Sequence, residues 1–259
     1  MPAVLSSQEN SVIRLPNGTR LHLSSSDFLE DAGCIIEEIF QAQVYRHPGF
    51  DLRPTDTIMD LGSHVGVFAH WAAPQIPSGR MICVEPTSSA DSFEYSLAQN
   101  GITNVRLHRC AAGPPSSTLE LIEDRRFAGL NRSHQFQPST FMHLMLAIQN
   151  IRQARKQLHI CRVPCRSIEE IMTSEKLDQC DLLKMDCEGG EYAILEHTSR
   201  HVLRRFKRIM LEFHLFHPGH SLRRIEHCLE ECGFSFQVKK KWLHHLLNRT
   251  GMIWATRID

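Results

Sequence analysis

The 259-residue sequence lacks long hydrophobic runs and an excess of either charge. No apolar stretch approaches the ~18 residues of a membrane-spanning helix, so no membrane span is expected. Lysine and arginine together number 29, as do aspartate and glutamate, and this balance gives no bulk attraction to nucleic acid. Residues 1–10 show neither a cationic start nor an apolar core, so we expect no signal peptide and predict a cytoplasmic protein.

The chain also lacks internal repeats, low-complexity linkers and the spaced ligand pairs of a structural zinc site. Its nine cysteines are an odd number and lie scattered along the chain. We interpret them as reduced, mostly buried thiols and not as a disulfide framework.

Strand and helix patterns alternate from Asp56 onward. Short apolar runs predict strands, and the amphipathic segments between them predict helices. This alternation predicts an α/β fold class with a mostly parallel seven-stranded sheet, helices on both faces and an antiparallel final strand. The expected strands are 57–61, 80–85, 105–110, 181–186, 208–213, 234–238 and 252–256, and the expected helices are 65–73, 88–99, 191–203 and 221–232.

Two segments fall outside this alternation. Residues 1–55 predict a hairpin and a helix that pack as an extension on the main domain, 56–259, because Pro16-Asn17-Gly18 separates two strand-like runs. Residues 124–160 form an insertion with an amphipathic helical pattern. We expect this insertion either to pack one face on the core or to act as a lid over the site that binds the substrate.

The first strand of the main domain ends in a turn that predicts a cofactor site. Glycines let a ligand approach the backbone, and the helix that follows attracts negative charge at its N-terminus. The dinucleotide fingerprint Gly-x-Gly-x-x-Gly is absent, since His64 and Val67 stand at its second and third glycine positions, so NAD is disfavoured. The candidate cofactor-binding residues of this turn are Asp60, Gly62, Ser63, His64 and Gly66.

The next strand ends in Glu85 and Pro86. A carboxylate at this point can accept hydrogen bonds from both hydroxyls of a ribose. The alternative is a strand end that merely faces solvent. The turn beside it favours the ribose role, so we add both residues to the predicted cofactor site.

A second group of acids follows the strands at 181–186 and 208–213. We predict that Asp186, Glu188 and His214 are catalytic, because two carboxylates and a histidine at one sheet edge can position a substrate or remove its proton. Asp186, Glu188 and Glu212 are also candidate ligands of a divalent cation such as Mg²⁺, which prefers oxygen donors. For Glu188 and Glu191 the alternative is that they cap the following helix. For His214 the alternative to a catalytic role is a structural role, in which the ring only forms hydrogen bonds.

With these residues placed, the chain resembles the FkbM family of methyltransferases. The turn Asp60–Gly66 resembles the first motif of class I S-adenosylmethionine-dependent methyltransferases, and Glu85-Pro86 follows it. The more specific motif is Lys184-x-Asp186-x-Glu188-Gly189-x-Glu191. Its lead-in, Val163–Ile171, and the following strand, Met210–His214, also resemble the family.

The resemblance implies a Rossmann-like sheet, S-adenosylmethionine as cofactor, and methyl transfer to a hydroxyl of a natural product or saccharide. Asp186 would lie beside the methyl group, and Cys110 and Ala111, at the end of the third strand, would lie near the adenine. The expected partner is a small-molecule or glycan acceptor, and a homodimer is an open alternative to a monomer. An N-methyltransferase and a catalytically silent cofactor-binding scaffold are the two other functions left open.

Overall fold

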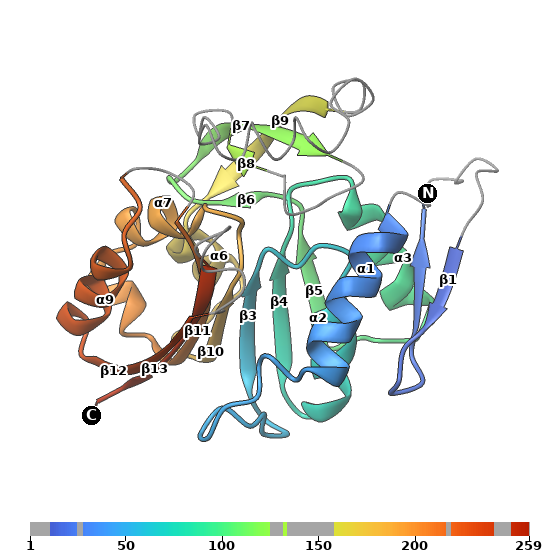
Figure 1. The fold of residues 1–259 in the computed structure, drawn as a ribbon, viewed down its shortest axis with the longest axis horizontal. Coiled ribbons are helices and arrows are strands. Elements are labelled where there is room, and N and C mark those ends of the chain that lie inside the picture. The colour runs from blue at the N-terminus through green and yellow to red at the C-terminus, as the bar shows by residue number, and fades with distance from the viewer. Residues whose placement is uncertain are drawn as a thin grey trace.

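The structure is a computed structural model that describes residues 11–24, 28–124, 132–133, 158–215, 219–240 and 250–258. Its centre is a seven-stranded sheet with the order β12-β13-β11-β10-β3-β4-β5 (Figure 1). The strands are β3 (Thr57–Leu61), β4 (Arg80–Val84), β5 (Val105–His108), β10 (Cys180–Met185), β11 (Phe206–His214), β12 (Phe234–Lys240) and β13 (Thr250–Arg257).

The direction of the strands confirms the predicted fold class. β11, β10, β3, β4 and β5 pair in parallel. The final strand, β13, is antiparallel to both of its neighbours, β11 and β12. The carboxyl ends of β3, β4, β5, β10 and β11 therefore meet at one edge of the sheet.

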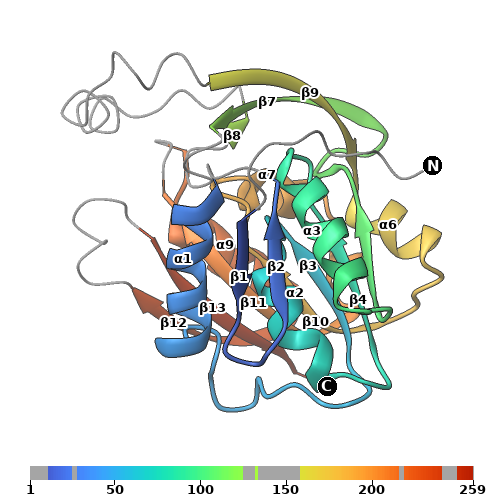
Figure 2. The ribbon, with the colours of Figure 1, turned by 90° about the vertical axis from the view of Figure 1, so that its right-hand side faces the viewer.

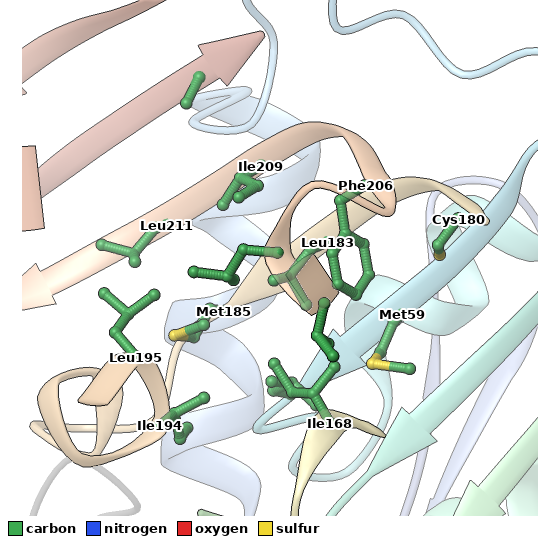
Figure 3. Packing of buried hydrophobic residues seen from close by; sticks show 14 of the residues in the cluster. Met59, Ile168, Cys180, Leu183, Met185, Ile194, Leu195, Phe206, Ile209 and Leu211 are labelled. Atoms are coloured by element: carbon green, nitrogen blue, oxygen red, sulfur yellow. The ribbon is translucent and has the colours of Figure 1, made fainter. Parts of the chain in front are cut away.

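Alternating side chains of the central strands enter two separate cores, as the strand pleat requires. Leu183 and Met185 of β10 face one core, and Leu182, which precedes them, faces the other. Figure 3 shows the first core, where Leu183 packs near Phe206 and Ile168. Each fully buried side chain of this kind contributes about 1.5–3 kcal/mol to stability, which fixes the register of the strands.

Helices cover both faces of the sheet, as predicted. One core includes residues of α6 (Ile168–Ser174), α7 (Glu191–Glu196), α8 (Arg200–Leu203) and α9 (Leu222–Glu231). The other includes residues of α1 (Leu29–Ile36), the π-helix η2 (Glu37–Gln41), α2 (Val67–Ala72) and α3 (Ser89–Gln99). A single 3₁₀ turn, η3 (Ala73–Gln75), extends α2.

The hairpin expected near the N-terminus is present. β1 (Ser11–Arg14) pairs antiparallel with β2 (Arg20–Leu23), and Gly18 adopts a φ of +90° in the turn between them. The hairpin is attached to α3 by side chains: Asn100 bonds both the N–H and the carbonyl oxygen of Arg20, at 2.8 and 2.7 Å. The division into an extension, 1–55, and a main domain, 56–259, stays a prediction.

A second, four-stranded sheet has the order β6-β9-β7-β8. Its strands are β6 (Ala111–Ala112), β7 (Ser117–Asp124), β8 (Arg132–Ser133) and β9 (Leu158–Arg166). β6 begins three residues after β5 ends, so this sheet adjoins the carboxyl edge of the main one. Figure 2 shows β7, β8 and β9 grouped at that end of the molecule.

The single helix expected over 191–203 is wrong, because the structure has two short helices there. Side chains terminate the first: His197 and Thr198 bond the carbonyl oxygens of Ala193 and Ile194. Ser199 then adopts an extended conformation, and its hydroxyl accepts a hydrogen bond from Val202 N–H at the start of α8.

The predicted helix of the insertion 124–160 lies outside the described residues, as does most of that segment. Its packing or lid role stays a prediction. Among the residues that the structure does describe, no helix has the length and apolar character needed to cross a membrane.

Candidate functional site

The turn after β3 curls over the end of β4, where Gly62 N–H and Ser63 N–H both donate to the Val84 carbonyl oxygen. Gly62 has a φ of +79°, and a β-carbon there would lie 1.9 Å from the backbone oxygen of Asp186. Gly66 has a φ of +84°, and a β-carbon there would lie 2.1 Å from the Phe93 ring. Gly62 therefore joins the turn to the second acidic segment, whereas Gly66 lets α3 pack closely.

Glu85 organises this turn with its own carboxylate. One oxygen, Oε2, accepts a hydrogen bond from His64 N–H at 2.8 Å. The other, Oε1, accepts from the N–H and the hydroxyl of Thr87 at 2.9 and 2.6 Å. A carboxylate has about four acceptor positions, so these bonds leave about one for a ligand hydroxyl.

The remaining candidate cofactor residues lie along the same edge. Ser63 donates its hydroxyl to the carbonyl oxygen of Asp60 at 3.0 Å. Pro86 follows Glu85 directly, and His64 packs the edge of its ring against Phe28. Two more, at the end of β5, are buried: Cys110 and Ala111 are 3% and 5% exposed.

A buried lysine connects the two acidic segments. Lys184 Nζ lies 2.9 Å from Asp60 Oδ1 and 4.0 Å from Asp186 Oδ2, and its side chain is 4% exposed. Burial opposes its charge, but Asp60 and Asp186 raise the pKa of Lys184 above its ordinary value. Tyr45 donates its hydroxyl to Asp186 Oδ2 at 3.2 Å. Nothing in the spacing of the sequence marks Tyr45, because it comes from the N-terminal segment.

His214 ends β11 between two carboxylates. Its Nδ1 lies 3.1 Å from Glu191 Oε1, and its Nε2 lies 3.5 Å from Glu188 Oε2. Glu191 is fully buried and also accepts hydrogen bonds from the N–H groups of Cys187 and Gly189. Glu191 thus holds the loop before α7 and also fixes the His214 ring, a role that the sequence did not indicate.

The ionisation of this pair follows from its surroundings. Burial is the largest influence on His214 and opposes its charge, but Glu191 and Glu188 raise the pKa of His214 well above its ordinary value. Burial raises the pKa of Glu188 to about 8, with His214 opposing and Asp186 reinforcing the change. At both groups, burial and the charge of the partner therefore act on the pKa in opposite directions.

The predicted catalytic residues converge in space. One ligand atom from each of Asp186, Glu188 and His214 lies within 4.8 Å of the other two. Among the described residues, this is the group of three that has the spacing of a metal site, and Glu212 lies outside it. Glu212 is nevertheless close enough to act on the charge of Glu188 and of His214.

Known proteins resemble this chain over most of its length. The sequence model of the "Methyltransferase FkbM domain" matches residues 60–236. The 31-O-demethyl-FK506 methyltransferase FkbM of Streptomyces tacrolimicus is 33% identical over 225 residues, which cover 78% of this chain and 81% of that protein. The AMB antimetabolite synthetase AmbE of Pseudomonas aeruginosa is 24% identical over 254 residues, and the match spans 88% of this chain but 12% of AmbE.

A solved structure shares the fold. The crystal structure of methyltransferase FkbM from Methylobacillus flagellatus superposes with a TM-score of 0.52 at 15% sequence identity. The match covers 82% of this chain and 46% of that one. It confirms the Rossmann-like arrangement of the main sheet.

Proposed function

The chain belongs to the FkbM methyltransferase family, and we propose that it transfers the methyl group of S-adenosylmethionine to a hydroxyl group of a small natural product or saccharide. One observation carries the proposal: the glycine turn after β3 touches the acidic segment after β10, at Gly62 and Asp186. A cofactor bound by the first segment would therefore present its methyl group to the second.

The turn Asp60–Gly66 and Glu85 serve the cofactor in this proposal. Glu85 keeps about one acceptor position beyond its bonds within the turn, which suits a single ribose hydroxyl. Within the turn, Asp60 is fully buried and pairs with Lys184, so it links the turn to β10.

The reaction is a displacement at the methyl carbon. The acceptor oxygen forms the new C–O bond as the bond between carbon and the sulfonium sulfur breaks, and the electron pair of that bond stays on sulfur. The products are a methyl ether and S-adenosylhomocysteine, and the hydroxyl proton must leave. We assign Asp186 and Glu188 to binding the hydroxyl and accepting its proton, with His214 held by Glu191 to orient Glu188.

The need to remove a proton from the acceptor favours transfer to oxygen over transfer to nitrogen. An amine nucleophile needs no strong base, whereas an alcohol does, and this site places two carboxylates and a histidine together. The Streptomyces relative is also named for a 31-O position.

Two measurements test the proposal. Calorimetry should detect binding of S-adenosylhomocysteine, and labelled S-adenosylmethionine should transfer its methyl group to a fraction of small hydroxylated metabolites or saccharides. Binding of NADH without any response to either methyl-donor compound would refute it. A product whose labelled methyl group is placed on nitrogen by NMR would refute only the choice of oxygen.

Glu188→Gln should lower turnover by about 10²–10⁴-fold, the range of a general base, while the affinity for S-adenosylhomocysteine stays the same. The matched control is Glu94→Gln on α3, an exposed carboxylate that pairs with Arg109. Full turnover of the Glu188→Gln protein would remove this residue from the mechanism.

A further inference from the structure

We propose that Asp186, Glu188 and His214 bind a divalent cation such as Mn²⁺ or Mg²⁺, an inference that rests on the function proposed above. The donor atoms of the three residues lie within 4.8 Å of one another. Two ligands about 2.1 Å from one ion can be at most about 4.2 Å apart, so side-chain shifts below about 1 Å would bring them into coordination. The two carboxylates suit Mg²⁺ or Mn²⁺, and the imidazole is a ligand for transition metals, so Mn²⁺ is the better probe of the site.

The orientation of His214 supports this site independently of the spacing. A metal-binding histidine typically donates its other ring N–H to a carboxylate, which fixes the ring and its tautomer. Here Nδ1 faces Glu191 at 3.1 Å, and Glu191 is fully buried and held by two backbone N–H groups. This leaves Nε2 directed toward Glu188, on the side where the ion would bind.

The site also holds more carboxylates than cationic side chains. The five carboxylates that interact here are Asp60, Asp186, Glu188, Glu191 and Glu212. Against them stand Lys184, which is already paired with Asp60, and His214. Carboxylates therefore outnumber cationic side chains by three in a largely buried region, an excess that a bound divalent cation would offset.

A cation at this position would supply what an alcohol acceptor lacks. Coordination of the acceptor hydroxyl to an open position would lower its pKa and stabilise the alkoxide that attacks the methyl carbon. The proton would pass to the second, uncoordinated oxygen of Asp186 and from there to solvent. The cation is neither oxidised nor reduced, so the methyl transfer balances as written above.

Electron paramagnetic resonance of Mn²⁺ tests the site without any acceptor. The full chain is treated with EDTA, freed of the chelator, and titrated with Mn²⁺ in the presence of S-adenosylhomocysteine. We expect one saturable Mn²⁺ per chain. Asp186→Asn and Glu188→Gln should each raise the Kd for Mn²⁺ by at least about 10-fold. Glu191→Gln, which alters the carboxylate that holds both His214 and the loop carrying Glu188, should raise it by about 10–100-fold.

Glu94→Gln is the matched control and should leave the Kd for Mn²⁺ unchanged. Unfolding temperature and binding of S-adenosylhomocysteine show that each variant is folded. Absence of saturable Mn²⁺ binding in the wild-type chain, or an unchanged Kd in both Asp186→Asn and Glu188→Gln, would overturn the site. Methyl transfer that EDTA does not affect would overturn the cation site and leave the methyltransferase proposal intact. Binding of Mn²⁺ without any binding of S-adenosylhomocysteine would instead support the cation site and contradict the methyltransferase proposal.

Discussion

Glu85 forms hydrogen bonds within its own turn, so replacing it should affect both the turn and the binding of a ligand. Glu85→Ala removes the acceptor of three hydrogen bonds within the turn as well as the position proposed for a ribose hydroxyl. We expect binding of S-adenosylhomocysteine to weaken by about 1–3 kcal/mol, the scale of hydrogen bonds to a charged group. Calorimetry measures this, with Glu94→Ala as the control, and an unchanged affinity would contradict the ribose role.

Single residues of the site differ in how well the sequence predicts them. Asp60 lies near the end of β3, and Glu85 and Asp186 directly follow β4 and β10, so the parallel sheet brings them to one edge whatever the details of the loops. The pairing of His214 with Glu191 is different, because it depends on how β11 lies beside β10 and on where α7 begins. Such a contact cannot be derived from spacing along the chain.

At the level of elements, α6 offers a direct test of local stabilisation. Ser167 caps it: its hydroxyl accepts from Glu170 N–H, and the Glu170 carboxylate accepts from Ser167 N–H. Ser167→Ala should lower the free energy of unfolding by about 0.5–2 kcal/mol, as measured by urea denaturation. Ser221 precedes α9 but forms no side-chain cap bond within the described part of the chain, so Ser221→Ala should cost far less. Equal losses in the two variants would contradict the capping argument.

The elements that the sequence predicts well are those with a strong local signal. β3 and β10 are continuous buried runs, and the predicted bounds of β3 match the structure. The small sheet was not predicted as a sheet, because β6 has only two residues and β7 pairs with a strand about forty residues away. The helix over 191–203 failed for the opposite reason, since side chains end it locally where the apolar pattern continues.

On the scale of the whole molecule, the site exists because two distant segments touch. β3 and β10 are neighbours in the sheet, with Leu182 opposite Ile58 and Met185 opposite Leu61. The N–H of Asp186 continues this pairing by donating to the Leu61 carbonyl oxygen at 3.0 Å. The proposed cofactor turn after β3 and the proposed acceptor site after β10 are therefore connected through the backbone. A change in one segment should displace the other.

Gly62→Ala tests this coupling, because the added β-carbon would lie 1.9 Å from the Asp186 backbone oxygen. Gly101→Ala is the matched control: Gly101 also has a positive φ, +62°, but a β-carbon there meets nothing within 4 Å among the described residues. In the control, the free energy of unfolding should fall by only about 1–2 kcal/mol, the cost of holding an alanine in the left-handed conformation. Gly62→Ala should lose a further ~1–3 kcal/mol from overpacking.

The two variants should also differ in function. Displacing the Asp186 backbone moves its carboxylate relative to the methyl donor, so Gly62→Ala should lose affinity for S-adenosylhomocysteine and, in the protein that stays folded, turnover as well. Gly101→Ala should keep both, since Gly101 follows α3 on the surface side of the helix end. Urea denaturation and calorimetry on the pair measure these effects. Similar losses of stability and affinity in the two proteins would mean that the contact between the two segments is not what holds the site together.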